Sequence, residues 1–225
     1  MRAILVEAAV DSAEAALAAV EAGAERVELC SDLDSGGLTP SAALLADLRP
    51  RLDVPILPMI RSRRGDFQYD AEEIETMLAQ LHELRTLGAD GFVFGALRGD
   101  RSIDTAAMAR IVEAAEGLPV VLHRAFDRTP DLSASLQVLI GLGIERVLTS
   151  GGAERAILGV DRLASLMREA RGRIGILPGG GIDAGNVHEI AARTGVTEVH
   201  ARCERDGERV RGIMRALELR REIGG

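Results

Sequence analysis

The feature that most constrains this chain is a regular alternation of short apolar runs with longer, alanine-rich amphipathic stretches. Eight apolar runs, rich in valine, isoleucine and leucine, begin 22 to 37 residues apart. Such runs are typical of buried parallel strands, and the stretches between them have the length and pattern of crossover helices. The pattern therefore predicts eight strand–helix units. The predicted strands begin near Ile4, Arg26, Val54, Gly91, Pro119, Arg146, Ile174 and Glu198.

Four of these units share a glycine shortly before the strand, at Gly23, Gly88, Gly143 and Gly195. Glycine favours the left-handed conformation in which many helices end. The four glycines precede every second strand, a repeat that a closed barrel allows. We therefore predict an α/β fold, a (βα)8 TIM barrel in which residues 1–225 form a single domain. A doubly wound open sheet is the alternative, but the sequence has no dinucleotide-binding glycine fingerprint.

Local signals and composition indicate where the first helix starts and which partners and compartment the protein has. Asp11 with Glu14 predicts a capping box at the start of the first helix. The chain carries 27 basic and 35 acidic residues, a net charge of -8, and such a surface repels nucleic acid and anionic lipid. No run of eighteen uncharged apolar residues occurs, so we expect neither a membrane partner nor a signal peptide. Two cysteines are too few for a disulfide framework and suit a reducing cytoplasm.

Ionisable side chains fall near the predicted carboxyl ends of the strands, where TIM barrels carry their chemistry. Glu28 and His200 are each the fifth residue after a repeated glycine, so both should face the barrel interior. Glu7 ends the first strand and His123 follows the fifth. We take these four as candidate general acids and bases. The alternative is a buried network of ion pairs without a catalytic role.

A second group of residues suits an anionic ligand. Arg61 closes the third strand and is expected to face the mouth, where a guanidinium can clamp an anion. Glycine clusters follow the sixth and seventh strands, and their amides are candidate phosphate or carboxylate ligands, although they fit ordinary turns as well. The candidate ligand-binding residues are Arg61, Asp66, Arg124, Asp127, Ser150, Gly151, Gly152, Gly179, Gly180 and Gly181.

Six strings in register resemble the CutC family, which is named for copper homeostasis. They are VELCSDLDSGGLTPS (27–41), PMIRSRRGDFQY (58–69), GADGFVFGAL (88–97), HRAFD (123–127), LTSGG (148–152) and PGGGI (178–182). The resemblance covers residues 1 to about 203. It implies a cytoplasmic TIM barrel, a homodimer, and a role in copper handling that includes copper binding.

Within the family pattern, the matching positions are Glu7, Glu28, Cys30, Arg61, Asp66, His123, Arg124, Asp127, Ser150 and His200. The sequence also departs from that pattern. Ala9 and Val10 stand where many members carry adjacent cysteines, and Ser62, Arg64 and Arg202 replace a proline, a glycine and a small residue.

Two hypotheses about function follow. Cu(I) prefers converging thiolate and thioether ligands, and Cys30, with Met59 near the mouth, is the candidate copper ligand; the alternative is that Cys30 is a small buried side chain. The competing hypothesis is an enzyme that acts on a phosphorylated or carboxylated small molecule by acid–base chemistry. The sequence shows no nucleophile elbow.

Overall fold

A computed structural model of the chain describes residues 4–223, which form eight strands and eight α-helices in alternation. The strands are β1 (Leu5–Val10), β2 (Arg26–Leu29), β3 (Ile56–Pro58), β4 (Phe92–Phe94), β5 (Val120–Leu122), β6 (Arg146–Thr149), β7 (Gly175–Pro178) and β8 (Glu198–Arg202). Each strand begins within two residues of its predicted start, so the eight-unit pattern is confirmed.

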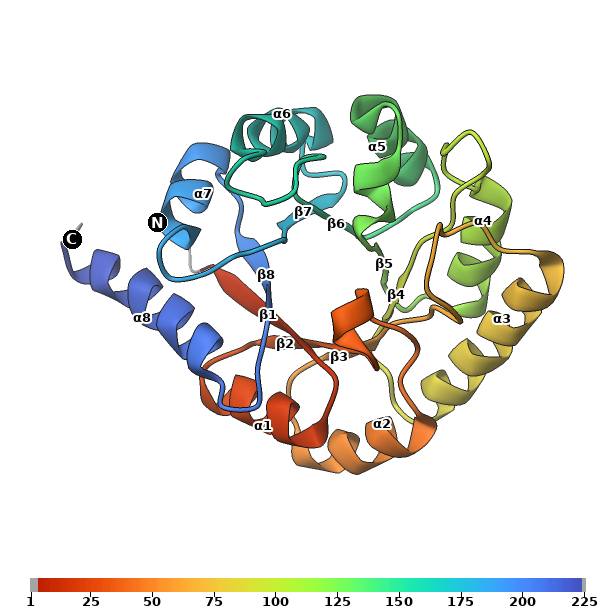
Figure 1. Ribbon diagram of the computed structural model, residues 1–225, viewed down its shortest axis with the longest axis horizontal. Coiled ribbons are helices and arrows are strands. Elements are labelled where there is room, and N and C mark those ends of the chain that lie inside the picture. Colours follow the sequence, from red (N-terminus) through yellow and green to blue (C-terminus); the bar gives the residue numbers. More distant parts are fainter. Residues whose placement is uncertain (1–3, 224–225) are drawn as a thin grey trace.

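The helices form an outer ring around the strands (Figure 1). They are α1 (Ala13–Glu21), α2 (Ala42–Leu48), α3 (Ala71–Thr86), α4 (Thr105–Ala114), α5 (Leu132–Gly141), α6 (Val160–Ala170), α7 (Val187–Thr194) and α8 (Glu208–Ile223). Short 3-10 turns at Leu33–Ser35, Arg49–Arg51 and Arg124–Arg128 supplement them. Among the described residues no helix is long and apolar enough to span a bilayer.

The strands pair in parallel in two runs, β3-β2-β1-β8 and β4-β5-β6-β7. A parallel bridge between Met59 and Val93 joins β3 to β4, and β7 lies beside β8 on the other side of the ring. The predicted (βα)8 TIM barrel is therefore confirmed, and the open sheet is excluded.

The helix ends explain the repeat. Gly23, Gly88, Gly143 and Gly195 all have positive φ, between 72° and 105°, so each adopts the left-handed conformation predicted for it. One helix start differs from the prediction. Ser12 caps α1 by accepting a hydrogen bond from the Ala15 amide at 3.2 Å, and the proposed Asp11 capping box is wrong.

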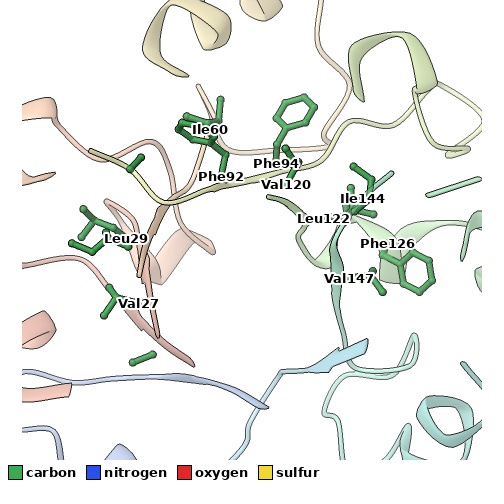
Figure 2. Packing of buried hydrophobic residues seen from close by; sticks show 14 of the residues in the cluster. Val27, Leu29, Ile60, Phe92, Phe94, Val120, Leu122, Phe126, Ile144 and Val147 are labelled. Carbon is green, nitrogen blue, oxygen red and sulfur yellow. The ribbon is translucent and has the colours of Figure 1, made fainter. Parts of the chain in front are cut away.

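Most of the apolar core lies between the barrel and the helices. Figure 2 shows Phe92, Phe94 and Phe126 pointing away from the barrel centre toward that layer. Inside the barrel a smaller apolar cluster fills one part of the interior, made of Cys30, Leu57, Met59, Val93 and Val121.

Charged side chains occupy another part of the barrel interior. Strand register places Glu7 beside His200 and beside Arg26, from the neighbouring strands β8 and β2. Glu28 lies two residues after Arg26 on the same strand and therefore on the same face. The ionisable side chains are thus grouped on β1, β2 and β8, against an apolar wall that starts at β3.

Candidate functional site

A cavity of about 820 Å³ opens where the strands end, a size common for sites that bind small molecules. The side chains of Glu28, Arg61, His123 and His200 line it, as predicted, together with Asp66, Arg124 and Asp127. The lining also includes Ala9, Leu33, Ser35, Gly36, Met59, Gly65, Phe67, Gln68, Leu97, Arg101, Arg128, Leu148, Gly180, Gly181, Ile182, Arg202 and Arg209.

Glu7 does not line this cavity, and each of its carboxyl oxygens has a hydrogen-bond partner. One oxygen accepts a hydrogen bond from Arg26, and the other lies 2.7 Å from Nδ1 of His200. Burial alone would raise the pKa of Glu7, but the His200 hydrogen bond and the charge of Arg26 lower it to about 2. Arg26 also pairs with Glu198 at 2.6 Å. Glu7 therefore belongs to a buried ion-pair network that includes Arg26 and His200.

Glu28, unlike Glu7, has a carboxyl oxygen without a hydrogen-bond partner in residues 4–223. Oε1 accepts a weak hydrogen bond from the Cys30 thiol at 3.5 Å, and Oε2 is buried with no hydrogen-bond partner in residues 4–223. Burial raises the pKa of Glu28, although the nearby charge of His200 opposes the rise. The pKa of His200 is also raised: burial would lower it, but the charge of Glu28 and the hydrogen bond to Glu7 outweigh that effect.

The pKa of His123 is shifted in the opposite direction to that of His200. Its Nδ1 accepts the amide proton of Ala125 at 3.2 Å, so the proton of the neutral ring is on Nε2. Burial and the nearby charge of Arg61 lower the pKa of His123 to about 3. Nε2 is buried and has no protein acceptor in the described chain. Gly95 leaves room for the ring, since a Cβ there would come within 2.6 Å of it. His123 is therefore a neutral hydrogen-bond donor.

Arg61 is a buried guanidinium without a carboxylate partner. Its side chain donates to backbone carbonyls, at 3.1 Å to Gly37 and 3.3 Å to Ser35, and it stacks 4.6 Å from the centre of the Phe67 ring. Nε is buried with no acceptor, and no ion pair within residues 4–223 includes Arg61. The residue is only 5% exposed. A charge buried in this way is costly unless an anion offsets it.

The glycine cluster after β6 does not offer its amides to a ligand, which corrects the expectation for Ser150, Gly151 and Gly152. Asp127 accepts hydrogen bonds from the amides of Ser150 and Gly152, at 3.1 and 3.0 Å. The Gly151 amide donates to the side chain of Thr149 at 2.9 Å. The carboxylate of Asp127 therefore occupies the anion position of this turn, and Arg124 completes it with a bond of 2.9 Å to the same carboxylate.

The cluster after β7 is different. Gly179 packs in the barrel wall, with its amide bonded to the Thr149 carbonyl at 3.0 Å. Gly180 and Gly181 line the cavity, and within residues 4–223 their amides donate to no other protein group. Of the six glycine-cluster residues predicted to bind a ligand, the cavity thus presents these two.

Cys30 lies beside the cavity without lining it. Its Sγ and the Sδ of Met59 lie 3.0 and 2.9 Å from the position that a Cβ on Gly37 would take, so the two sulfur atoms face the same small space. Burial and the charge of Glu28 raise the pKa of the Cys30 thiol well above its usual value. A harder cluster of possible ligands, Glu7, Glu28 and His200, has atoms within 4.8 Å of one another, but Arg26 and His200 already use the oxygens of Glu7.

Sequence reasoning missed several residues of the site. Arg26 lies two residues before Glu28, and strand alternation would have placed both on the inner face. Arg209 is in the first turn of α8, directly after the last strand, a position that barrels often use. Phe67 carries no such signal, because its place under Arg61 depends on a loop with positive φ.

Comparison with known proteins shows which family the chain belongs to. The model of the CutC family matches residues 4–204. A protein of Xanthomonas axonopodis pv. citri called "family protein CutC" is 47% identical over 196 residues, which cover 87% of this chain and 82% of that protein. A protein of the same name from Caulobacter vibrioides is 45% identical, over 88% of this chain and 80% of that one.

Solved structures agree with the fold. The putative copper homeostasis protein CutC of Streptococcus agalactiae is 34% identical with a TM-score of 0.84, covering 88% of this chain and 97% of that one. Phosphoribosylanthranilate isomerase of Thermotoga maritima, at 13% identity and a TM-score of 0.63 over 96% of this chain and 98% of that one, is similar in fold alone.

Proposed function

The chain belongs to the CutC family, and from that premise and the geometry of its cavity we propose that the barrel binds a small organic anion and exchanges a proton with it. The observation that carries the proposal is Arg61, a buried guanidinium that faces a cavity and has no carboxylate partner in residues 4–223. A bound carboxylate would supply the missing charge and accept the free Nε hydrogen.

Two neighbouring groups suit the chemistry. His123 lines the cavity, and its Nε2–H has no acceptor in residues 4–223, so it can donate to a ligand carbonyl oxygen that gains negative charge. Glu28 has an unused oxygen in the same cavity and can take a proton from carbon. A 2-oxo acid combines the groups that these side chains would bind: a carboxylate for Arg61, a carbonyl for His123 and a neighbouring C–H for Glu28.

Calorimetric titration with pyruvate tests the binding step. We expect saturable binding by the unmodified protein and by Arg63→Gln, whose side chain lies in the same loop but outside the cavity lining. We expect Arg61→Gln to bind at least about tenfold more weakly, because it loses a charge-assisted contact. Arg61→Lys keeps the charge and should fall between the two. Equal affinities for Arg61→Gln and Arg63→Gln would contradict the proposal.

Exchange of the methyl protons of pyruvate in D2O, followed by NMR, tests the proton transfer. The protein should accelerate exchange, and Glu28→Gln should slow the catalysed rate about a hundredfold or more. Glu25→Gln, three residues earlier and exposed, is the matched control. Catalysed exchange that persists unchanged in Glu28→Gln would remove Glu28 from this role.

A second candidate function is Cu(I) binding, as the name of the Streptococcus agalactiae relative suggests. It is favoured by the shared space of the Cys30 and Met59 sulfur atoms. Two sulfur donors fit Cu(I), whereas the occupied oxygens of Glu7 fit a harder ion poorly. Copper would have to displace the thiol proton of Cys30, so binding should weaken as the pH falls.

Competition with a Cu(I) chelator tests this candidate. Cys30→Ser and Met59→Leu should each weaken copper binding, while Cys203→Ser, at the other cysteine, should leave it unchanged. Copper affinity that does not depend on Cys30 would end the candidate. The proposal also includes a cytoplasmic location, which two free cysteines suit, and a homodimer, which sedimentation of the protein tests.

A further inference from the structure

β7 lies across the ring of strands from β3 (Figure 1), and the residues that line the cavity near β7 carry a second set of unused hydrogen-bond donors. We propose that Gly180, Gly181, Arg124 and Arg209 form a second anion subsite, and that the natural ligand is a phosphate monoester of a small carboxylic acid. The proposal rests on the proposed function, since it keeps the carboxylate at Arg61, and adds the phosphate at the opposite wall.

The backbone of this subsite is a glycine turn. Gly180 and Gly181 have φ of 97° and 74°, and successive backbone amides in a turn can form a concave anion site. A Cβ at Gly180 would lie 3.1 Å from Nη1 of Arg124, so glycine avoids crowding between the turn and the guanidinium. Neither amide has a protein acceptor in the described chain.

Arg124 and Arg209 each have one guanidinium nitrogen, Nη1, without an acceptor in residues 4–223. Arg124 uses Nε for Asp127 and Nη2 for Ser150, at 2.9 and 2.8 Å. Arg209 uses Nε and Nη2 for Glu204, with the shortest contact at 2.8 Å. Nη1 of each residue has no acceptor in residues 4–223, although both residues line the cavity. Their own carboxylate partners fix the guanidinium groups and leave these donors for a ligand.

The neighbouring turn shows what chemistry such a loop accepts. After β6, the amides of Ser150 and Gly152 receive the carboxylate of Asp127. After β7, the equivalent turn receives no anion from the described chain. The cavity is lined by six arginines and three carboxylic acids, so its mouth has an excess of positive charge. A phosphate dianion, with three terminal oxygens, can accept hydrogen bonds from the two amides and the two guanidinium groups together.

The buried side chains supply the independent indication that a ligand belongs here. Nε of Arg61 and Nε2 of His123 are both buried without partners, in residues that are 5% and 4% exposed, and both residues line this same cavity. One ligand that spans the cavity could accept hydrogen bonds from these two buried donors and from the amides of the β7 turn.

Calorimetric titration with inorganic phosphate tests the subsite by itself. We expect saturable binding that Arg209→Gln weakens at least about fivefold. Arg211→Gln is the matched control: it lies two residues later in α8, is similarly exposed, pairs with Glu208, and does not line the cavity. Absence of saturable phosphate binding, or equal weakening by both substitutions, would overturn the proposal.

A series of phosphorylated acids of increasing length tests the bridging. Among 2-phosphoglycolate, 3-phosphoglycerate and 6-phosphogluconate, at least one should bind about tenfold more tightly than inorganic phosphate, because two subsites then share one ligand. That gain should disappear in Arg61→Gln and in Arg209→Gln. If no member binds more tightly than phosphate, the bridging ligand is ruled out. Pyruvate binding that depends on Arg61 without phosphate binding would leave the proposed function standing and reject only the second subsite.

Discussion

Two histidines in one cavity have pKa values that are shifted in opposite directions, and their neighbours explain why. His200 is flanked by the carboxyl groups of Glu7 and Glu28, which raise its pKa despite burial. Burial and the nearby charge of Arg61 lower the pKa of His123 to about 3. The surroundings thus favour the protonated form of His200 and the neutral form of His123.

The neutral state of His123 makes a prediction for stability against pH. The pKa is about 3 in the folded protein and 6.5 in the unfolded chain, so the unfolded chain binds the proton first as the pH falls. The associated stability is present above pH 6.5 and is lost between pH 6.5 and 3. At pH 5 the loss is about 2 kcal/mol.

Urea unfolding at pH 7.5 and pH 5 measures this effect. His123→Gln should lose less stability between the two pH values than the unmodified protein, by about that amount. His82→Gln, an exposed histidine of α3, should behave like the unmodified protein. A His123→Gln variant with an unchanged pH dependence would mean that His123 is protonated in the fold.

Arg26 is the residue on which the buried ion pairs depend. It contacts both Glu7 and Glu198, and Arg146 reaches Glu198 at 3.2 Å. Arg26→Met should destabilise the protein by about 3 to 5 kcal/mol, because it leaves buried carboxylates without their cation. Arg193→Met removes an exposed arginine from its ion pairs and should change the urea midpoint little. Similar midpoints for the two variants would show that the buried network contributes no stability.

At the scale of elements, the helix ends are determined by glycines whose conformation is left-handed. Gly141 and Gly143 lie two residues apart at the end of α5, and a Cβ at either position meets no atom within 4 Å. They differ in backbone conformation, since Gly143 has φ of 72° and Gly141 does not have positive φ. The pair therefore separates the cost of a left-handed residue from the cost of crowding.

Substitution of these two glycines should have opposite effects on thermal stability. Gly141→Ala should stabilise the protein by about 0.5 kcal/mol, because alanine loses less backbone entropy in a helix. Gly143→Ala should destabilise it by about 1 kcal/mol, because alanine is strained in the left-handed region. Thermal unfolding followed by circular dichroism measures both. Effects of the same sign would refute this explanation of the repeat.

At the scale of the whole molecule, the sequence predicted the features that follow from the regular spacing of strands and helices. Strand starts, the left-handed glycines and the inward direction of Glu28 and His200 follow from local spacing, and the structure confirms them. The hydrogen-bond and stacking partners of the site residues could not be predicted from the sequence. The capture of the β6 amides by Asp127 and the stacking of Phe67 with Arg61 depend on how distant loops fold together.

The charge of the molecule is also unevenly distributed. The chain as a whole carries a net charge of -8, yet arginines outnumber carboxylic acids by six to three around the cavity. A local excess of positive charge at a cavity favours the approach of small anions. Arg61 is the buried end of this basic mouth, and the account depends on its binding an anion.

The NMR signal of the Arg61 Nε–H group reports that event at the atom concerned. We predict that pyruvate, added to the ¹⁵N-labelled protein, shifts this resonance in a saturable way, while the Nε–H resonance of Arg63 keeps its position. A resonance of Arg61 that stays fixed while pyruvate binds elsewhere on the protein would contradict the account.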